Sequence, residues 1–150
     1  MLAATIPALM SEVTTSGTIA LLMRVSRRAY RLVRAHEDVL GMKLKSFIAL
    51  NYLREEDPVT QRALGDTLML DANNCVLLLN ELEEHGWVRR VRDPADRRRH
   101  IVQMTPAGAK ALAQAERALD KLEPYVLKGL DDDEIGVLQG LLRQAADGGA

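Results

Sequence analysis

Six arginines lie within the eleven residues from Arg89 to Arg99, and their side chains could bind phosphate. Set against Asp93 and Asp96, they leave a local charge of six minus two, or +4, while the whole chain carries a formal net charge of −1 at pH 7. A guanidinium can bind a phosphate through two hydrogen bonds and can enter a narrow DNA minor groove. Charge runs are more often solvated surface turns. Both interpretations, a solvated turn and a contact with nucleic acid, stay open for this cluster. Its arginines are Arg89, Arg90, Arg92, Arg97, Arg98 and Arg99.

These arginines fall on a segment with the pattern of a β-hairpin. Gly86 is expected to end the preceding helix in a left-handed conformation. Strand-forming residues follow on both sides of Asp93–Asp96, whose Asp and Pro residues favour a turn. The pattern predicts a hairpin with its tip near residues 93–99. The strand-forming residues are Trp87, Val88 and Val91 before the turn, and Ile101, Val102 and Met104 after it.

Two short helices with a turn between them precede the hairpin. Thr60 can cap a helix from Gln61 to Leu68, and Asp71 can cap a second helix that ends at Glu84. Apolar residues at i, i+3, i+4 and i+7 of the second helix predict its buried side. These residues are Cys75, Leu78, Leu79 and Leu82. The residues expected to face outward are Asn73, Asn74, Val76, Leu77, Asn80 and Glu81, and the Glu81–His85 stretch is predicted to be an exposed helix end.

The asparagines at the start of the second helix admit two roles. Asparagine can bond adenine bidentately in the major groove, and the N-terminal part of a recognition helix is the part that meets base edges. Asparagine also favours helix starts for local reasons, because its side chain bonds nearby backbone groups. We weigh the two roles equally for Asn73 and for Asn74.

The rest of the chain has the pattern of packed helices. Helices are predicted over about 18–38, over Lys43–Arg54, and from Thr105–Pro106 to a kink or end at Pro124. A last helix is predicted to begin near Asp131–Glu134, with a disordered tail from Ala145. Residues 1–15 fit either a loose tail or a short helix that packs on a partner. A short unit of two helices and a hairpin does not need all the apolar surface of the terminal helices, so we expect that surface to be buried in a symmetric dimer.

The segment Gly86–Gly108 resembles the MarR family of bacterial transcriptional regulators. Its wing tip, DPADRR, is followed by a strand, by Met-Thr and by a glycine, as in the family signature. The resemblance implies a mainly α fold with a small β-hairpin wing. Within one domain over residues 1–150, it places a winged helix-turn-helix core at about 43–104 and dimerisation helices at about 18–38 and 106–145. The matching residues are Asp93, Pro94, Asp96, Arg97, Arg98, Thr105 and Gly108.

The resemblance also implies a function and a contact surface. It implies a homodimer that binds double-stranded DNA at an inverted repeat, usually as a repressor, with recognition helices in successive major grooves and wings in the minor groove. Arg98 would enter the minor groove, held by Asp96. The expected DNA contacts are Asn73, Asn74, Val76, Leu77 and Asn80 in the helix and Arg90, Arg97, Arg98 and Arg99 in the hairpin, with Asp93 and Asp96 positioning the wing.

Two residues depart from the family pattern. Val76 and Leu77 stand where the family often has Thr and Arg. This favours apolar contact with a thymine methyl and a larger share of binding through phosphates and DNA shape. Two alternatives remain, an architectural protein that binds any duplex equally and a winged fold that does not use DNA.

Small-molecule control is a further expectation. Members of the family often bind small anionic aromatic compounds where the first helix, the second helix and the helix after the wing meet. The candidate wall residues are Tyr30, Arg34, His36 and Met42. Redox control through Cys75 is the alternative, although its place on the buried stripe favours an inert thiol.

Other functions find little support in the sequence. The chain has no GxSxG, phosphate-loop, HExxH or paired-cysteine motif, and its three histidines are scattered, so we expect no enzyme activity, cofactor or metal. The sequence contains no run of about 18 uncharged apolar residues, so no membrane span is expected. A single cysteine cannot form an internal disulfide, which favours a cytoplasmic protein.

Overall fold

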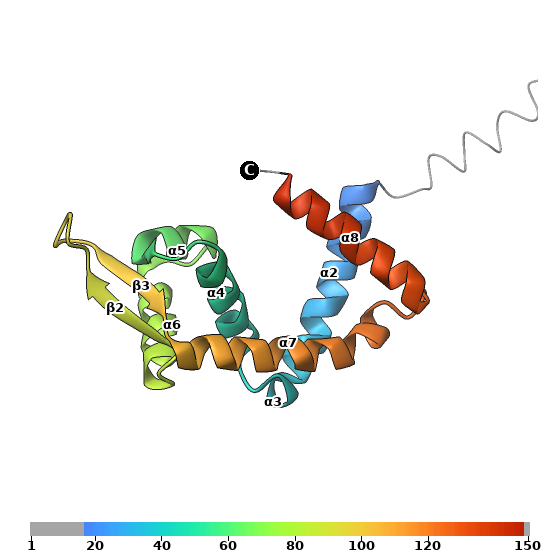
Figure 1. The fold of residues 1–150 in the computed structure, drawn as a ribbon, viewed down its shortest axis with the longest axis horizontal. Helices are drawn as coiled ribbons and strands as arrows, with labels where there is room; N and C mark the ends of the chain where they lie inside the picture. The colour runs from blue at the N-terminus through green and yellow to red at the C-terminus, as the bar shows by residue number, and fades with distance from the viewer. Residues whose placement is uncertain (1–16, 149–150) are drawn as a thin grey trace, which may run out of the picture. The chain divides into compact units, whose positions relative to one another are not determined.

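The computed structural model describes residues 17–148 and is mainly helical, with a small antiparallel sheet (Figure 1). The prediction of a mainly α fold with a β-hairpin is confirmed. No helix in this part of the chain is long and apolar enough to cross a membrane. The elements are α2 (Thr18–Ala35), α3 (Glu37–Leu40), α4 (Leu44–Glu55), β1 (Val59–Thr60), α5 (Gln61–Thr67), α6 (Ala72–Glu84), β2 (Val88–Arg92), β3 (His100–Met104), α7 (Pro106–Val126) and α8 (Asp132–Asp147).

The chain divides into two compact units. One unit runs from Val33 to Leu122 and contains the helix pair, the sheet and most of α7. The other joins the chain segments on either side of it, and among the described residues it contains most of α2 and all of α8. The residues predicted to contact DNA therefore all lie in the unit from Val33 to Leu122.

The helix-turn-helix begins where its capping residues predict. The Thr60 hydroxyl accepts a hydrogen bond from the N–H of Ala63 at 3.1 Å and starts α5, and the Asp71 carboxylate accepts one from the N–H of Asn74 at 2.7 Å and starts α6. Gly86 follows α6 with φ = 72°, in the left-handed conformation that glycine adopts without strain. Both predicted caps and the predicted helix end are confirmed.

The hairpin is also present, and a third strand extends it. β2 and β3 pair antiparallel from Val88 opposite Met104 to Arg92 opposite His100, so the tip covers residues 93–99 as predicted. β1 pairs with the other edge of β3, with Val59 opposite Val102. β1 was not predicted, because a strand of two residues has no periodicity. In Figure 1 the tip of the hairpin extends away from α5 and α6.

Leucines from several elements form the core of the unit from Val33 to Leu122. The stripe predicted for α6 is buried in full. Ser46 is a buried polar residue of α4, and no buried side-chain polar atom among the described residues lacks a hydrogen-bond partner. The α6 stripe therefore packs in a core that includes Leu50, Leu53, Leu64, Leu78, Leu79, Leu82, Val102 and Leu112.

A cluster of hydrogen bonds around Thr105 closes the base of the hairpin. The N–H of Thr105 donates to the carbonyl of Trp87 at 2.9 Å, and its hydroxyl donates to the carbonyl of Gly86 at 2.6 Å. The same hydroxyl accepts from the N–H of Gly108 at 3.0 Å in the first turn of α7. Thr105 thus joins the end of α6, the start of β2 and the start of α7.

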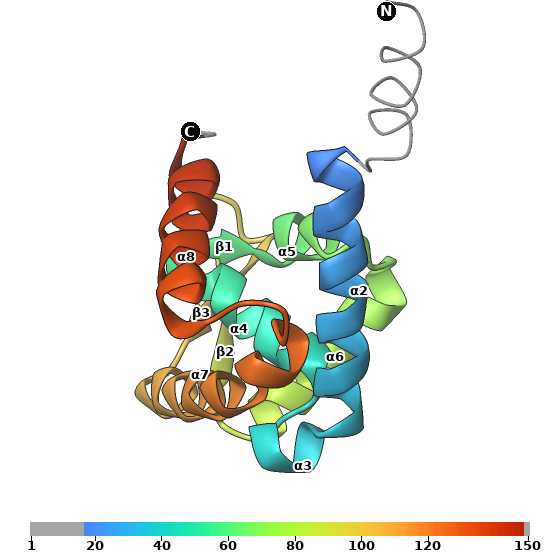
Figure 2. The ribbon, with the colours of Figure 1, turned by 90° about the vertical axis from the view of Figure 1, so that its right-hand side faces the viewer.

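The boundaries that differ from prediction by more than one residue are the ends of α2, α7 and α8. The helix predicted over 18–38 is interrupted at His36: α2 ends at Ala35 and the short α3 follows, ending at Gly41 with φ = 77° (Figure 2). α7 continues two residues past Pro124, to Val126.

The disordered tail predicted from Ala145 is instead helical through Asp147. The capping box of Asp131 and Glu134 starts α8, and Gly148 caps its end. The expectation for residues 1–15 lies outside the described residues.

Candidate nucleic-acid interface

Two aspartates shape the tip of the hairpin through backbone hydrogen bonds. Asp93 accepts from the N–H of Ala95 at 2.9 Å, and Asp96 accepts from the N–H of Arg98 at 3.1 Å. The other carboxylate oxygen of Asp96 lies 3.4 Å from Nε of Arg99. Asp96 therefore contacts the backbone of Arg98 and the side chain of Arg99, whereas the resemblance implied that it holds the side chain of Arg98.

Four of the six hairpin arginines have partners inside the protein. Nε of Arg89 donates to Gln103 at 3.0 Å, and Arg92 donates to the carbonyl of Arg97 at 2.7 Å. Arg99 pairs with Asp96, and Arg90 is bound by two residues of α6, as described below. The side chains of Arg97 and Arg98 are exposed and have no partner among the described residues. These two guanidiniums are thus available to an external anion.

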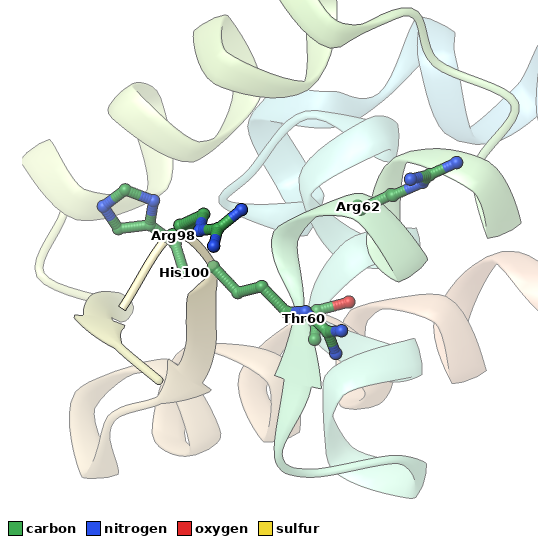
Figure 3. Close-up of a pocket in the computed structure, with 5 residues that line it drawn as sticks. Thr60, Arg62, Arg98 and His100 are labelled. Carbon is green, nitrogen blue, oxygen red and sulfur yellow. The ribbon is translucent and has the colours of Figure 1, made fainter. Parts of the chain in front are cut away.

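Arg98 also lines a hollow between the hairpin tip and the start of α5. The hollow has a volume of about 540 Å³ and is lined by Thr60, Arg62, Arg98, Arg99 and His100. Figure 3 shows Thr60 and Arg62 on the helical side and Arg98 and His100 on the hairpin side. Arg62 lies 3.9 Å from Asp66 and Arg99 lies 3.4 Å from Asp96, so Arg98 is the guanidinium of this hollow that has no acidic partner among the described residues and can attract a phosphate group. Arg62 was not among the predicted site residues, because only the fold brings it near the hairpin.

The outward face of α6 is partly engaged in contacts within the protein. Asn73 and Leu77 are exposed, and Val76 is half-buried. The amide of Asn74 donates to Asp71 at 2.8 Å, in addition to its backbone bond. These two bonds hold the pKa of the Asp71 carboxyl below its ordinary value, the backbone N–H of Asn74 having the larger effect. Asn74 therefore belongs to the helix cap. The side-chain amide of Asn73, in contrast, makes no hydrogen bond to the rest of the described chain.

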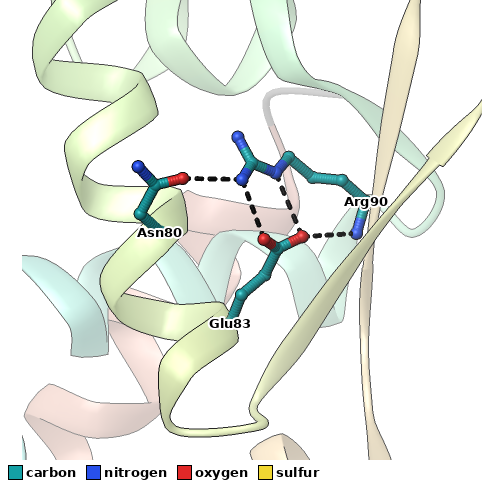
Figure 4. A network of polar contacts seen from close by, with 3 residues as sticks. All are labelled: Asn80, Glu83 and Arg90. Carbon is teal, nitrogen blue, oxygen red and sulfur yellow. Dashed lines mark hydrogen bonds and ion pairs between the residues drawn. The ribbon is translucent and has the colours of Figure 1, made fainter.

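Arg90 and Asn80, both predicted to contact DNA, bind each other. Arg90 donates to Asn80 at 2.6 Å and to both carboxylate oxygens of Glu83, from Nε at 3.0 Å and from Nη2 at 2.8 Å (Figure 4). The side-chain hydrogen bond from Arg90 is the main cause of a lowered pKa for the Glu83 carboxyl. The guanidinium of Arg90 is directed at α6.

The predicted exposed helix end at Glu81–His85 is wrong at two residues. Glu81 pairs with Lys43 at 2.8 Å and with Lys45 at 3.3 Å, both at the start of α4. The hydrogen bond from Lys43 lowers the pKa of the Glu81 carboxyl most. Glu81 and Glu83 are two positions apart, so they point to different sides of α6 and bind different elements. The spacing of these two glutamates was the only feature of the sequence that could have indicated their contacts.

The four residues predicted to bind a ligand differ in how far they are buried. Tyr30 and Arg34 are exposed on α2, His36 is half-buried after it, and Met42 is buried. Met42 lines a hollow of about 430 Å³ between the α3–α4 junction and the end of α6. The other residues around this hollow are Glu37, Asp38, Gly41, Lys43, Ser46, Glu81, His85 and Trp87.

Cys75 is buried, as the stripe predicted. It is 2% exposed, and its thiol lies 3.5 Å from the carbonyl of Gln61. Burial raises the pKa of the Cys75 thiol, despite the opposing effect of the positive charge of Arg90. A buried, protonated thiol reacts slowly with oxidants, which does not favour redox control.

The helix pair, the wing and the free guanidiniums at its tip are the arrangement of a winged-helix DNA-binding protein. A model of the MarR family matches residues 40–99. A Thauera aromatica protein, named as a transcriptional regulatory protein for the hcr operon, is 36% identical over 95 residues, which cover 63% of this chain and 57% of that protein. Both the sequence and the fold match the MarR family of DNA-binding transcription regulators.

Solved structures of the family have the same fold. A cysteine-to-serine mutant of MarR from E. coli matches with a TM-score of 0.75 and 26% identity, over 88% of this chain and 98% of that one. The same mutant in complex with operator DNA matches with a TM-score of 0.64 and 27% identity, over 84% of this chain and 91% of that one. The prediction of the family and of a winged helix-turn-helix is confirmed.

Proposed function

We propose that this protein is a sequence-specific repressor that binds an inverted-repeat operator as a homodimer. The observation that carries the proposal is that Arg97 and Arg98, at the wing tip beside the hollow lined by Arg62, are exposed and have no partner in the described part of the chain. Basic side chains that neutralise phosphates release bound counterions, which provides most of the sequence-independent affinity for DNA. The related MarR from E. coli has been solved in complex with operator DNA, which supports DNA binding by a chain of this fold.

In this proposal α6 lies in the major groove and the wing tip in the adjacent minor groove. The exposed N-terminal end of α6 presents Asn73, the kind of side chain that can bond adenine bidentately. Val76 and Leu77 offer apolar surface suited to a thymine methyl. Base recognition would therefore be sparse, and contacts with phosphates and groove shape would contribute more.

Apolar surface on the terminal helices supports the dimer. α2 exposes Ile19, at 72%, and also Leu22 and Met23, while α8 exposes Val137 at 64% and has no buried residue. Apolar surface of this extent is rare on monomers, and two-fold dimers bury the same patch on both chains. A two-fold dimer would place its two recognition helices about 34–36 Å apart, one turn of DNA.

Replacing Asn73 with alanine is expected to relax base preference more than it weakens binding. A bidentate contact contributes about 1–3 kcal/mol of discrimination against the wrong base. Binding to an operator series with single base-pair changes would locate the one or two positions at which the variant loses that preference. Asn74→Ala is the matched control, and it is expected to lower helix stability without a change in preference, because Asn74 belongs to the cap. Unchanged preference in Asn73→Ala would exclude Asn73 as a base contact.

A mobility-shift titration would test the proposed function. The probe is the DNA upstream of the protein's own gene, with unrelated duplex as competitor and salt varied, and the oligomeric state is measured by ultracentrifugation. A repressor of this kind forms a dimer and stays on the probe in the presence of competitor. Equal loss of binding to any competitor would favour the architectural alternative, and absence of binding would favour a winged fold that does not use DNA.

We also propose small-molecule control, at the hollow lined by Met42. The hollow lies next to the ion pair between Lys43 and Glu81, so a ligand there would act on α6. Three carboxylates around it, from Glu37, Asp38 and Glu81, outnumber the two lysines, Lys43 and Lys45, that pair with Glu81, which favours a neutral or cationic ligand over an anionic aromatic acid. A thermal-shift titration is expected to respond to a planar aromatic amine and not to salicylate, and the reverse result would favour the anionic ligand.

A further inference from the structure

We infer that Arg90 is a positioning residue, which acts through Glu83 and Asn80 to fix the wing relative to the recognition helix and does not itself contact DNA. The inference rests on the proposed function, because it assigns a role within the DNA-binding surface. It reassigns Arg90 and Asn80, which the sequence places among the expected DNA contacts. It also gives a role to Glu83, which the sequence analysis left in an exposed helix end.

The geometry of the three residues is that of a clamp between α6 and β2. Glu83 accepts the backbone N–H of Arg90 at 3.0 Å, so the carboxylate binds the strand as well as the side chain. The guanidinium donates to both oxygens of Glu83 and to the amide oxygen of Asn80. A bidentate pair of this kind fixes direction as well as distance. The side chain of Arg90 is only 22% exposed and that of Glu83 33%.

The clamp connects α6 to β2 at a distance from the turn that joins them in the chain. After α6 the chain turns at Gly86 and enters β2 at Val88. The other hydrogen bonds between the end of α6 and the hairpin lie close to this turn: the N–H of Trp87 donates to the carbonyl of Leu82 at 3.0 Å, and Thr105 bonds to Gly86 at the hairpin base. The wing tip lies at the far end of the hairpin from that base, so a small change of angle at the base becomes a larger displacement at Arg98.

Charge also argues against a direct contact of Arg90 with phosphate. Its positive charge is neutralised by Glu83, whereas Arg97 and Arg98 have no acidic partner among the described residues. A phosphate that took Arg90 from Glu83 would leave a carboxylate unpaired beside DNA, which is unfavourable. Arg90 thus differs from the tip arginines in direction and in available charge.

The two roles predict opposite results for Glu83→Gln. If Arg90 bound phosphate, removal of the neighbouring negative charge would leave operator affinity unchanged or strengthen it. If the clamp positions the wing, Glu83→Gln is expected to weaken operator binding by about 10-fold. Arg90→Gln is expected to weaken it to a similar degree, and the double variant no further, because both single changes remove the same connection.

The salt dependence of operator binding tests whether Arg90 itself contacts a phosphate. Loss of one phosphate contact lowers the slope of log K against log salt by about 0.9. For Arg90→Gln we expect the same slope as for Glu83→Gln, which removes the clamp but keeps the arginine. For Arg90→Lys, which keeps the charge but loses the bidentate geometry, we expect the same weakening as for Arg90→Gln. Arg89→Gln is the matched control from the same strand, since the Arg89 side chain is exposed and, within residues 17–148, bonds only to Gln103.

Each outcome bears on the inference once circular dichroism and thermal melting establish that every variant is folded. A lower slope in Arg90→Gln than in Glu83→Gln, or full affinity in Glu83→Gln or Arg90→Lys, would overturn it. Additive losses in the double variant would also overturn it. Failure of the proposed function is a separate result, because in that case the unaltered protein would not distinguish operator from competitor.

Discussion

Replacing Gly108 with alanine is expected to destabilise the protein by roughly 3 kcal/mol or more. A Cβ at this position would lie 2.1 Å from the carbonyl oxygen of Trp87, 2.9 Å from its carbonyl carbon and 3.0 Å from Cγ of Met104. The first two are backbone atoms, which Thr105 holds in place through the hydrogen bond to Trp87. Relief of the clash therefore requires α7 or β2 to move. Urea denaturation, monitored by circular dichroism, would measure the loss.

Gly136→Ala is the matched control for this prediction. Gly136 lies within α8, and a Cβ there would meet no atom within 4 Å. Alanine is favoured over glycine in a helix interior by about 1 kcal/mol, so this variant is expected to be as stable as the unaltered protein or more so. If Gly108→Ala unfolded at the same urea concentration as the unaltered protein, the close approach of α7 to Trp87 would be wrong.

Replacing Arg98 with alanine is expected to weaken operator binding by about 100-fold, or roughly 3 kcal/mol, at moderate salt. The guanidinium is exposed and unpaired among the described residues, so its removal costs no internal contact and the loss falls on DNA binding. The slope of log K against log salt is expected to fall by about 0.9, as for one phosphate contact. The measurement is a mobility-shift or fluorescence titration of one operator duplex at several salt concentrations.

Arg117→Ala separates this effect from a general loss of positive charge. Arg117 is exposed eleven residues into α7, about 16 Å along the helix from the base of the hairpin. Its removal is expected to leave affinity and slope close to those of the unaltered protein. Equal losses in the two variants would mean that the wing tip has no special place in binding, and undiminished binding in Arg98→Ala would remove it from the contact surface.

The sequence was informative wherever local chemistry decides local structure. Thr60 and Asp71 are good caps in any context, and the spacing of Cys75, Leu78, Leu79 and Leu82 defines one helix face, so the helix-turn-helix could be predicted from the residues alone. The hairpin followed from two strand-forming runs around an Asp-Pro turn.

The contacts that the sequence did not predict all join elements that are separate in the chain. β1 exists because the edge of β3 pairs with it, and the pairing of Glu81 with two lysines depends on how α4 packs against α6. The count of arginines in the hairpin also overstated the free charge, since four of the six have partners within the protein. The charge pattern located the surface but could not identify which guanidiniums are free.

The apolar residues exposed on α2 and α8 have a consequence for the response of a regulator. In the proposed dimer, these residues make operator binding depend on two equilibria in series, association of two chains and capture of DNA. Below the dissociation constant of the dimer, the concentration of the binding species rises with the square of the chain concentration, by mass action. Operator occupancy would then change more steeply with expression level than one-step binding allows. Val137 is far in the sequence from any proposed DNA contact. Val137→Asp would raise the chain concentration at which the operator becomes occupied, without altering the affinity of the assembled dimer for DNA.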